Sequence, residues 1–581
     1  MDRDRAALVL EEIARLLELQ GEDRFRVRAF RTAARALERL EEDLGQVVRS
    51  GRLGEVRGIG AATARIITEL VETGRASYHE TLRERTPLGM RELLAVPGLG
   101  PGRVRTLHAS LGIETLADLE RALAEDRVAG LPGFGRRTAE RVAGGIGFVR
   151  SGLGRRRLGP ALEALERATG IVRALPHVVR AVGAGEGRRS LETVGELVVV
   201  AEADADRFQE IIAAFLDLPG MMRTRALAPD EAEALLSDGL ALRLVLAIAD
   251  AFATTCIEET GAASHVAQLR ERARTLGLEL TREGVGRGET RIPTRDEEEV
   301  YAALELEPVP PELREGTIEV VAAAEGWLPR LIVEGDLRGC FHCHTTYSDG
   351  KATIGELGEA ARALGWRYLG IADHSQAASY AQGLSPEQVM RQHAEIDAWN
   401  ARHGDVVRLF KGIEADIQAD GGLDYEGSAP GLLERFDYVI GSVHSRFGLS
   451  REEMTRRIVR AVRNPRLTML GHATGRLLLT RRPYDVDVNA VIDAAAESGA
   501  AVEINADPHR LDLDWRHWPR AKAAGVRCAI NPDAHSVDGL RVLPLGVRMA
   551  RKGWLEVKDV VNAWELEEVE VWLAGQKARA P

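Results

Sequence analysis

Seven short apolar runs recur between residues 337 and 535, and six of them lead into a histidine or a carboxylate. Segments with helical spacing separate the runs, among them residues 354–364, 452–462, 488–498 and 518–524. Strands that alternate with helices form parallel βα units, and in a barrel of such units every strand opens at its carboxyl end onto one face. We therefore expect side chains that are far apart in the sequence to converge at that face.

Nine side chains that can bind metals stand at or just after these runs. They are His342, His344, Asp349, His374, Glu414, His444, His472, Asp533 and His535. Imidazole suits zinc, iron and copper, whereas carboxylate suits manganese and magnesium, so the mixture predicts a transition-metal site. One four-coordinate ion needs fewer ligands, and two or three metals are therefore expected. The alternative is that the histidines are buried and bonded within their own barrel, which would account for one histidine more readily than for six.

The charge of the chain is unevenly distributed. The net charge is −12, but residues 1–160 hold 28 arginines and 23 acidic residues and are net positive by 5, which leaves −17 for the remainder. The first region can thus attract a polyanion although the whole chain is acidic. Four cysteines are too few for a disulfide scaffold. Because the sequence shows no signal peptide and no apolar run of 18 residues, we expect a cytoplasmic protein without a membrane partner.

A glycine turn occurs three times in this basic region, at residues 56–60, 96–100 and 131–135. Helical apolar spacing extends over residues 5–19, 24–40 and 61–73. The repeated turn resembles the helix-hairpin-helix motif, whose glycines let the backbone approach a phosphate at the start of the following helix. Such contacts hold DNA without reading its sequence. The residues expected to bind DNA are Gly58, Gly60, Arg65, Gly98, Gly100, Arg103, Arg105, Gly133, Gly135, Arg136 and Arg137.

The candidate metal ligands lie in motifs that resemble those of the polymerase-and-histidinol-phosphatase (PHP) family of metal-dependent phosphoesterases. The motifs are His342-x-His344, Ser348-Asp349-Gly350, Asp373-His374, Glu414, His444, Gly471-His472 and Asp533-x-His535. The resemblance implies a distorted (β/α)7 barrel with manganese or zinc, or else iron, as the metal. It assigns His342, His344, Glu414 and Asp533 to one metal, Glu414 with His444 and His472 to a second, and Asp349, His374 and His535 to a third.

Catalysis at such a site depends on two metals that stabilise the attacking and the leaving oxygen of a phosphodiester. The resemblance places Glu414 and Asp533 at the centre of this chemistry. Arg446 and Arg476 each follow a metal ligand by a few residues, and we interpret them as candidates for binding the substrate phosphate. The alternative is that both are solvated arginines in loops.

The order of features before the barrel resembles a family X DNA polymerase, whose bacterial members carry a C-terminal PHP domain. Residues 185–195 resemble its nucleotide-binding turn and residues 260–273 its thumb motif. The resemblance implies five domains. They are a helical DNA-binding domain at 1–85, helix-hairpin-helix fingers at 86–155, an α+β nucleotidyltransferase-like palm at 156–248, a thumb at 249–325 and the PHP metallo-phosphoesterase domain at 330–575.

The palm departs from the family pattern where polymerisation needs carboxylates. The family's three metal-binding aspartates correspond here to Glu196, Val198 and Ala241. Glu186 stands where the family has a serine beside the phosphates, and its charge would repel them. Loss of metal ligands predicts a degenerate polymerase site, because even residues that only orient such ligands contribute strongly to metal affinity. We assign Glu196, Val198, Ala241, Arg188 and Arg189 to this degenerate site.

An alternative interpretation keeps the polymerase active. A shifted strand register would bring in Glu202, Asp204 and Asp206, and magnesium or manganese would then support residual polymerisation. More simply, these acids end a strand and open the next helix, where acidic side chains suit the helix dipole.

Together these features predict a monomeric DNA-repair enzyme of the bacterial nucleoid. We expect a metal-dependent 3′→5′ exonuclease or phosphoesterase that acts on gapped or 3′-ended DNA without sequence specificity. Two alternatives are a gap-filling polymerase with non-standard carboxylates and a non-catalytic DNA-binding scaffold. A small-molecule phosphatase fits the barrel but leaves the residues before 336 without a role.

Overall fold

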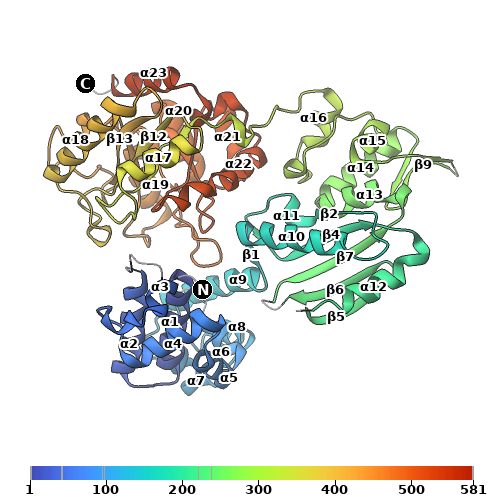
Figure 1. Ribbon diagram of the computed structural model, residues 1–581, viewed down its shortest axis with the longest axis horizontal. Helices are drawn as coiled ribbons and strands as arrows, with labels where there is room; N and C mark the ends of the chain where they lie inside the picture. Colours follow the sequence, from blue (N-terminus) through green and yellow to red (C-terminus); the bar gives the residue numbers. More distant parts are fainter. Residues whose placement is uncertain are drawn as a thin grey trace. The chain divides into compact units, whose positions relative to one another are not determined.

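The computed structural model describes residues 3–38, 40, 44–94, 96, 98–219, 221–236, 239–288 and 290–578. The chain divides into two compact units, Met1–Leu153 and Gly154–Pro581. Figure 1 shows the elements of both, coloured along the sequence.

The first unit is helical throughout its described residues. Its helices are α1 (Arg3–Leu19), α2 (Arg24–Glu38), α3 (Leu44–Arg49), η1 (Arg52–Glu55), α4 (Ala61–Thr73), α5 (Ser77–Arg85), α6 (Leu88–Leu94), α7 (Pro101–Leu111), α8 (Leu116–Ala124) and α9 (Arg136–Gly152). The predicted helix over residues 61–73 is confirmed with the same bounds, and α1 and α2 confirm the two predicted before it, although α2 ends at Glu38 rather than at residue 40. Buried apolar residues form two clusters, one centred on α1 and α2 and the other on α6–α9.

The palm opens the second unit with a five-stranded sheet in the order β2-β4-β7-β6-β5, in which only the central pair β4 and β7 is parallel. A short strand pair, β1 with β3, lies beside it. The elements are β1 (Arg156–Arg157), α10 (Leu158–Arg173), β2 (Arg180–Ala184), α11 (Gly185–Arg188), β3 (Thr193–Val194), β4 (Glu196–Glu202), η2 (Ala205–Arg207), α12 (Phe208–Leu216), β5 (Met221–Ala228), β6 (Glu231–Leu236) and β7 (Ala241–Ala247). This is the α+β arrangement expected for the palm.

The thumb that follows combines helices with a small antiparallel sheet of order β10-β9-β8. Its elements are α13 (Ala249–Thr260), α14 (Ala263–Thr275), β8 (Glu279–Thr281), β9 (Gly284–Arg287), β10 (Thr290–Ile292), α15 (Glu297–Ala303), η3 (Pro311–Leu313) and α16 (Glu319–Glu325). Asp296 caps α15 by accepting from the backbone N–H of Glu299, a contact that satisfies one free N–H group of the first turn.

The last domain is a nearly closed barrel of seven parallel strands in sequence order, β11 to β17, which confirms the predicted fold (Figure 1). The strands are β11 (Gly339–Cys340), β12 (Tyr368–Ile371), β13 (Arg408–Asp416), β14 (Tyr438–Ser442), β15 (Met469–Leu470), β16 (Ala501–Asn505) and β17 (Cys528–Asn531). An isolated parallel bridge between Cys343 and Ala534 joins the chain just past β11 to the chain just past β17. This bridge brings the first and last strand ends to the same mouth.

The helices of this domain separate the barrel strands as the spacing predicted, except for η4, which precedes β11, and the helices from η8 onwards, which follow β17. They are η4 (Glu334–Asp336), α17 (Ile354–Ala363), η5 (Ser379–Ala381), α18 (Pro386–His403), η6 (Leu433–Arg435), α19 (Arg451–Val462), α20 (Val488–Ser498), η7 (Trp515–His517), α21 (Trp518–Ala523), η8 (Asp538–Val542), α22 (Leu543–Lys552), η9 (Val557–Asp559), η10 (Val561–Ala563) and α23 (Leu566–Lys577). Thr353 and Ser450 begin α17 and α19 with capping boxes to Glu356 and Glu453, a local signal that specifies where a helix starts.

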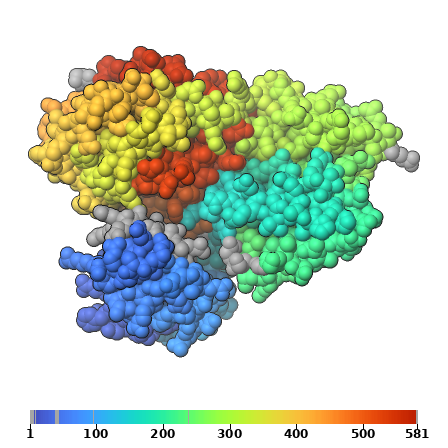
Figure 2. All heavy atoms as spheres, viewed as in Figure 1, coloured from blue at the N-terminus to red at the C-terminus, as the bar shows by residue number. Residues whose placement is uncertain are grey.

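The palm and the barrel share one hydrophobic core within the second unit. Buried residues of α10 and the palm sheet belong to the same apolar cluster as those of the barrel strands and α22. In Figure 2 the red surface of the C-terminal helices meets the cyan surface of the palm. Lys552 of α22 accordingly donates to the carbonyl oxygen of Arg189 at 3.0 Å.

Candidate metal centre and DNA-binding elements

The barrel strands deliver all nine predicted metal ligands to one mouth. Glu414 lies within β13, and the others follow the carboxyl ends of their strands. Five of the nine are buried, namely His342, His344, His374, Glu414 and His472. Asp533 adopts a left-handed backbone conformation with φ of 52°, which costs free energy for a residue other than glycine and is typical of functional sites.

Glu414 stands at the centre of the cluster. Its Oε1 lies 3.0 Å from Nε2 of His472, 3.2 Å from Nε2 of His444 and 3.5 Å from Nε2 of His342. Its Oε2 lies 2.9 Å from Nδ1 of His374 and 3.8 Å from Nε2 of His344. One carboxylate therefore faces five imidazoles.

Two further carboxylates complete the cluster on either side. Asp533 Oδ1 lies 3.2 Å from Nε2 of His344 and 3.6 Å from Nε2 of His342. Asp349 Oδ1 lies 3.4 Å from Nε2 of His535, 3.7 Å from Nε2 of His374 and 4.0 Å from Nδ1 of His344. Both ring nitrogens of His344 thus face carboxylates, one on each side.

The donor atoms fall into three groups that are compact enough to hold a metal ion. They are His344, Asp349, His374 and His535; His342, His344 and Glu414; and His374, Glu414 and His444. The three groups agree in number with the three metals implied by the resemblance, but His344 and His374 each belong to two of them. In the structure these two imidazoles therefore each serve two donor groups, whereas the predicted assignment places every imidazole at a single metal.

The donors also carry buried atoms that lack hydrogen-bond partners. These include Nε2 of His342, Nδ1 of His344 and Oε2 of Glu414. A buried polar atom without a partner is costly, and a divalent cation bound between these atoms would satisfy them. The residues present therefore fit divalent metal binding.

The electrostatics of the cluster favour ionised carboxylates. Burial alone would raise the pKa of Glu414, but His444, His374 and His342 hold it well below its ordinary value. The pKa of Asp533 is likewise raised by burial and lowered further by His342 and His344, so that it ends well below normal. Burial, together with His535 and His374, lowers the pKa of His344 to about 3. Ionised carboxylates and a neutral imidazole are the forms that bind metals.

Sequence reasoning did not identify the acidic residues behind the ligands. Glu503 of β16 accepts from Nδ1 of His342 at 2.7 Å, and Asp416 of β13 accepts from Nδ1 of His444 at 2.6 Å. Such contacts fix the ring orientation of a metal-binding histidine. The available signal was an acidic side chain inside an otherwise apolar strand, at the third position of residues 501–505 for Glu503.

The prediction for Arg476 is wrong. Its side chain is buried and donates from Nε to the carbonyl of Arg510 at 2.9 Å, from Nη1 to Asp514 at 2.7 Å and from Nη2 to the carbonyl of Leu511. Arg476 therefore braces the loop after β16, and its guanidinium is buried among these acceptors and not presented to a substrate. Arg446 is exposed at the mouth with φ of 54°, and no ion pair involves it among the described residues.

Arg510 occupies the position that was predicted for Arg476. Arg510 lies on the loop after β16, and its Nε is 3.5 Å from Oδ2 of Asp533. None of the described residues accepts a hydrogen bond from its side chain. Burial lowers the pKa of Arg510, but Asp533, Glu414 and Asp507 raise it above the ordinary value. Arg510 is thus a fixed cation beside the cluster.

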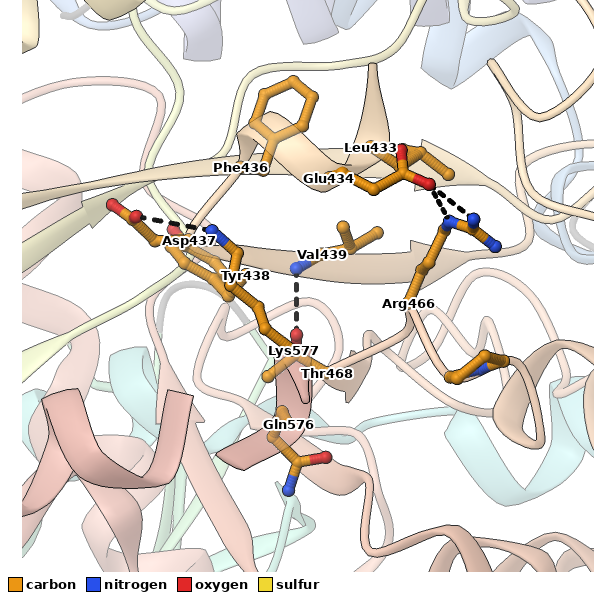
Figure 3. A pocket seen from close by; sticks show the side chains of 11 residues that line it. Leu433, Glu434, Phe436, Asp437, Tyr438, Val439, Arg466, Thr468, Gln576 and Lys577 are labelled. Atoms are coloured by element: carbon orange, nitrogen blue, oxygen red, sulfur yellow. Dashed lines mark hydrogen bonds and ion pairs between the residues drawn. The ribbon is translucent and has the colours of Figure 1, made fainter. Parts of the chain in front are cut away.

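A cavity of about 250 Å³ lies at the opposite end of the barrel, where β14 begins. Figure 3 shows its polar side chains paired with one another, Arg466 with Glu434 and Lys577 with Asp437. The paired charges leave this cavity without the convergent free polar groups of a binding site.

The palm site that was predicted to be degenerate is organised around Arg243, a cation from the protein itself. Glu196 on β4 and Ala241 on β7 are register partners, as are Val198 and Arg243. Arg243 reaches Glu259 at 2.5 Å, Glu196 at 3.2 Å and Glu231 at 3.7 Å. The side chains of Val198 and Ala241 offer no oxygen, and the guanidinium of Arg243 lies beside Glu196, the one carboxylate at the three positions where the family pattern puts metal ligands.

The turn predicted to bind the nucleotide also has its charged side chains paired with other groups of the protein. Glu186 accepts from the backbone N–H of Gly195 at 2.7 Å and from Arg155 at 2.9 Å. Arg188 donates to both carboxylate oxygens of Glu297, at 2.7 and 2.8 Å. Arg189 donates to Glu315 at 3.1 Å and to the carbonyl of Thr260. Glu186, Arg188 and Arg189 are therefore each paired with other groups of the protein.

The structure contradicts the shifted register that would restore the polymerase. Glu202 stands at the far end of β4 from Glu196, six residues and roughly 20 Å along an extended strand, and it pairs with Arg180 at 2.5 Å. Asp204 is the residue before η2, and Asp206 lies within η2, so both are past the strand. These acids open a helix, as the simpler interpretation predicted.

The three glycine turns of the first unit share one construction. The first glycine of each has a left-handed backbone, with φ of 102° at Gly58, 93° at Gly98 and 80° at Gly133. The second glycine, at position 60, 100 or 135, precedes the first residue of α4, α7 or α9. This is the turn-to-helix geometry that presents backbone N–H groups to an anion.

The arginines beside these turns divide into two classes. Arg65, Arg105, Arg136 and Arg137 are exposed. Arg103 instead donates to the carbonyls of Gly98 at 2.7 Å and Gly133 at 3.1 Å, so it joins the second turn to the third. Part of the role expected of Arg103 in DNA binding is therefore structural.

Comparisons with known proteins agree with this organisation. The chain matches family models for a helix-hairpin-helix domain at residues 1–76, a SAM-like helix-hairpin-helix tandem at 90–143, a DNA polymerase beta thumb at 255–315 and a PHP domain at 341–506. It is 35% identical over 571 residues to the DNA polymerase/3'-5' exonuclease PolX of Bacillus subtilis, covering 97% of this chain and 98% of that protein. It is also 31% identical over 208 residues to a probable phosphatase of Caldicellulosiruptor saccharolyticus, covering 33% of this chain and 78% of that protein. Among the described helices, none has the length and apolar character needed to cross a bilayer.

Proposed function

Because this chain belongs to the bacterial family X DNA polymerases that carry a C-terminal PHP domain, the family of PolX from Bacillus subtilis, we propose that it hydrolyses DNA from 3′ ends at the barrel mouth and that its palm no longer polymerises. The observation that carries the proposal is that the other eight candidate metal ligands converge with Glu414 at one mouth. Metal-assisted hydrolysis of a phosphodiester needs such a centre, and the described residues of the palm form none.

The metal ligands of this proposal are the nine predicted residues, with manganese or zinc as the resident ions because imidazole and carboxylate are mixed. At such a site divalent metals supply an activated water and neutralise charge on the phosphate. Glu503 and Asp416 hold the imidazoles of His342 and His444 in a fixed orientation and tautomer. Arg510 donates to a phosphate oxygen of the scissile bond, with Arg446 exposed at the rim of the same mouth.

The palm acts as a frame in this proposal. Arg243 on β7 is paired with Glu196, Glu231 and Glu259. Magnesium or manganese ions bound there would have to displace a cation that is tethered to the same carboxylates. Without oxygens from Val198 and Ala241, the site offers too few ligands to compensate.

The first unit holds the DNA. Its exposed arginines and the helix starts at residues 60, 100 and 135 suit the phosphate backbone, so gapped or 3′-ended DNA is bound without sequence preference. A monomer that works in DNA repair at the bacterial nucleoid accounts for these features.

The proposal is tested with a 5′-labelled duplex that has a recessed 3′ end, in the presence of manganese. We expect shortening from the 3′ end, and we expect His344→Ala and Asp533→Ala to reduce its rate by roughly 100-fold or more, since loss of a ligand should exceed the effect of losing a residue that orients one. The control is Arg541→Ala, because Arg541 is exposed and only weakly paired with Asp538 at 3.7 Å. Digestion by the two ligand variants at the wild-type rate would overturn the proposal.

Incorporation of one labelled nucleotide into a gapped duplex tests the palm separately. We expect no incorporation by the wild type with magnesium or manganese. Incorporation that is abolished by Glu196→Ala or Asp204→Ala and kept by His344→Ala would instead establish an active polymerase with non-standard carboxylates. DNA binding that survives chelation, without turnover under any metal, would point to the scaffold.

A further inference from the structure

The loop after β16, residues 506–514, lines the mouth of the barrel and lies against the palm. Arg510 on this loop faces Asp533, and Asp507 precedes it. On the palm side, a Cβ built at Gly159 would lie 3.3 Å from Leu545 Cδ1 and 3.8 Å from Cβ of Pro508. The start of the palm, β1 and the first turn of α10, therefore packs directly beside this loop.

The palm segment at this contact is the basic run Arg155-Arg156-Arg157. Arg155 is fully engaged, with hydrogen bonds to Thr193 and Glu186. Arg157 ends β1 and precedes α10, and its side chain is partly buried. In the described part of the chain no hydrogen bond or ion pair holds its guanidinium. A partly buried arginine without a partner is unusual, because its desolvation is not compensated.

The charge that Arg157 faces belongs to the barrel mouth. Burial lowers the pKa of Arg157, and Asp507 is the acidic group that opposes this effect. Asp507 lies on the same loop as Arg510, whose Nε is 3.5 Å from Oδ2 of Asp533, and the charges that act on Asp507 include those of Asp533, Arg510, His535 and Arg157. Its Oδ1 is already occupied, because it accepts from the backbone N–H of His509 at 2.7 Å. Arg157 thus lies near Asp507 without pairing with it.

A DNA strand that enters this mouth presents more than one phosphate. When the scissile phosphate is at the metal cluster, the next phosphate towards the 5′ end must lie against the wall of the mouth. Arg510 is close to the cluster, and Arg157 lies on the palm segment that packs against the same loop, two residues before Gly159, which lies beside Pro508. An arginine with free donors is suited to a phosphate at that position.

We propose that Arg157 binds the phosphate on the 5′ side of the scissile bond, so that the palm supplies part of the substrate site of the barrel. This inference rests on the proposed exonuclease function. It gives the palm a role in hydrolysis that does not depend on polymerisation, and it requires the palm and barrel to stay joined while the strand is fed in.

The test compares two single-stranded substrates of the full-length, manganese-loaded protein. One is a ten-nucleotide strand, and the other is a dinucleoside monophosphate, which carries the scissile phosphate alone. We expect Arg157→Ala to raise KM for the longer strand about tenfold, the value of one charge-assisted hydrogen bond, with kcat for that strand within twofold of wild type. The ratio of kcat/KM between the longer and the shorter substrate should fall by the same factor. Arg157→Lys should restore part of the ratio.

Salt dependence gives a second readout. The slope of log KM against log salt for the longer strand should fall by about 0.7 in Arg157→Ala, as expected for the loss of one phosphate contact on a single strand. Arg167→Ala is the matched control, since Arg167 is exposed on α10 and pairs only weakly with Glu163 at 3.8 Å. A ratio and slope in Arg157→Ala equal to those of Arg167→Ala would overturn this inference alone. A wild type without exonuclease activity would overturn the proposed function instead. Should Arg157→Ala fail to fold, Arg157→Gln and Arg157→Lys carry the same comparison.

Discussion

Glu503 shows how single residues behind the ligands organise the candidate metal centre. It is buried and accepts from Nδ1 of His342 and from the backbone N–H of His472, each at 2.7 Å, and from Asn531 at 3.1 Å. One carboxylate therefore orients ligands that follow two different strands. Removing its charge should disturb both without removing a metal ligand.

We accordingly predict that Glu503→Gln lowers metal affinity by about 10–100-fold, the usual effect of losing a carboxylate that orients a metal-binding histidine. The measurement is metal content after dialysis against a graded series of chelator concentrations. Glu434→Gln is the control, because Glu434 is an acidic side chain at the other end of the barrel, paired with Arg466. Equal retention of metal by Glu503→Gln and wild type would show that Glu503 serves packing only.

At the scale of elements, α15 joins the thumb to the palm through one carboxylate. Glu297, at the start of α15, accepts hydrogen bonds from Arg188 of α11. It also accepts two hydrogen bonds, at 2.9 and 3.0 Å, from Arg314, the residue just after η3. Burial would raise the pKa of Glu297, but Arg314 and Arg188 lower it to about 2. A carboxylate with a depressed folded pKa stabilises the fold above its unfolded pKa, near 4.5, and loses this contribution as the pH falls towards 2.

We predict that Glu297→Gln lowers the free energy of unfolding by about 3 kcal/mol at pH 7, because two partly or fully buried arginines lose their counter-charge. The difference from wild type should narrow as the pH is lowered from 5 to 3. Thermal unfolding across this pH range measures both effects. Glu298→Gln, an exposed neighbour on the same helix, should unfold like wild type, and a pH-independent difference for Glu297→Gln would contradict the assignment.

The elements were predictable where the local sequence specifies their ends. Helix α4 begins after Gly60 and ends before Gly74, and α20 ends before Gly499, so glycines mark these boundaries in the sequence. The ligands were predictable for a related reason, because strand ends of a parallel barrel must share a face. The roles of Arg476 and Arg510 could not be predicted, since they depend on how residues 506–514 fold back across the mouth. No periodic pattern in a sequence specifies the path of a loop.

In the palm, the sequence likewise does not predict which charged side chains pair with one another. The sequence shows which carboxylates are missing, because Val198 and Ala241 have no acidic group. It does not show what replaces the metals. Arg243 pairs with Glu196, Glu231 and Glu259 because of the register of β4, β6 and β7 and the position of α13. Only the folded sheet defines that register.

At the scale of the second unit, Lys552 ties three parts of the chain together. It is buried and donates from Nζ to the carbonyl of Arg189 in the palm at 3.0 Å, and to the carbonyl of Glu312 in η3 of the thumb and the carboxylate of Glu315 just after η3. Its ammonium also lies 4.4 Å from the ring centroid of Trp515 in the barrel. Burial lowers the pKa of Lys552, and Glu315 opposes this effect.

We therefore predict that Lys552→Met destabilises the palm and the barrel together, by about 3 kcal/mol, because it leaves a carboxylate and two carbonyls without their buried cation. Hydrogen exchange should quicken in α11 of the palm as well as in α22 of the barrel, since one apolar core extends through both. Lys558→Met is the control, because Lys558 is exposed and its partner Glu556 also binds Lys522. Faster exchange in α22 alone would mean that the domains unfold independently, and a palm that separates so readily could not hold Arg157 beside the barrel mouth.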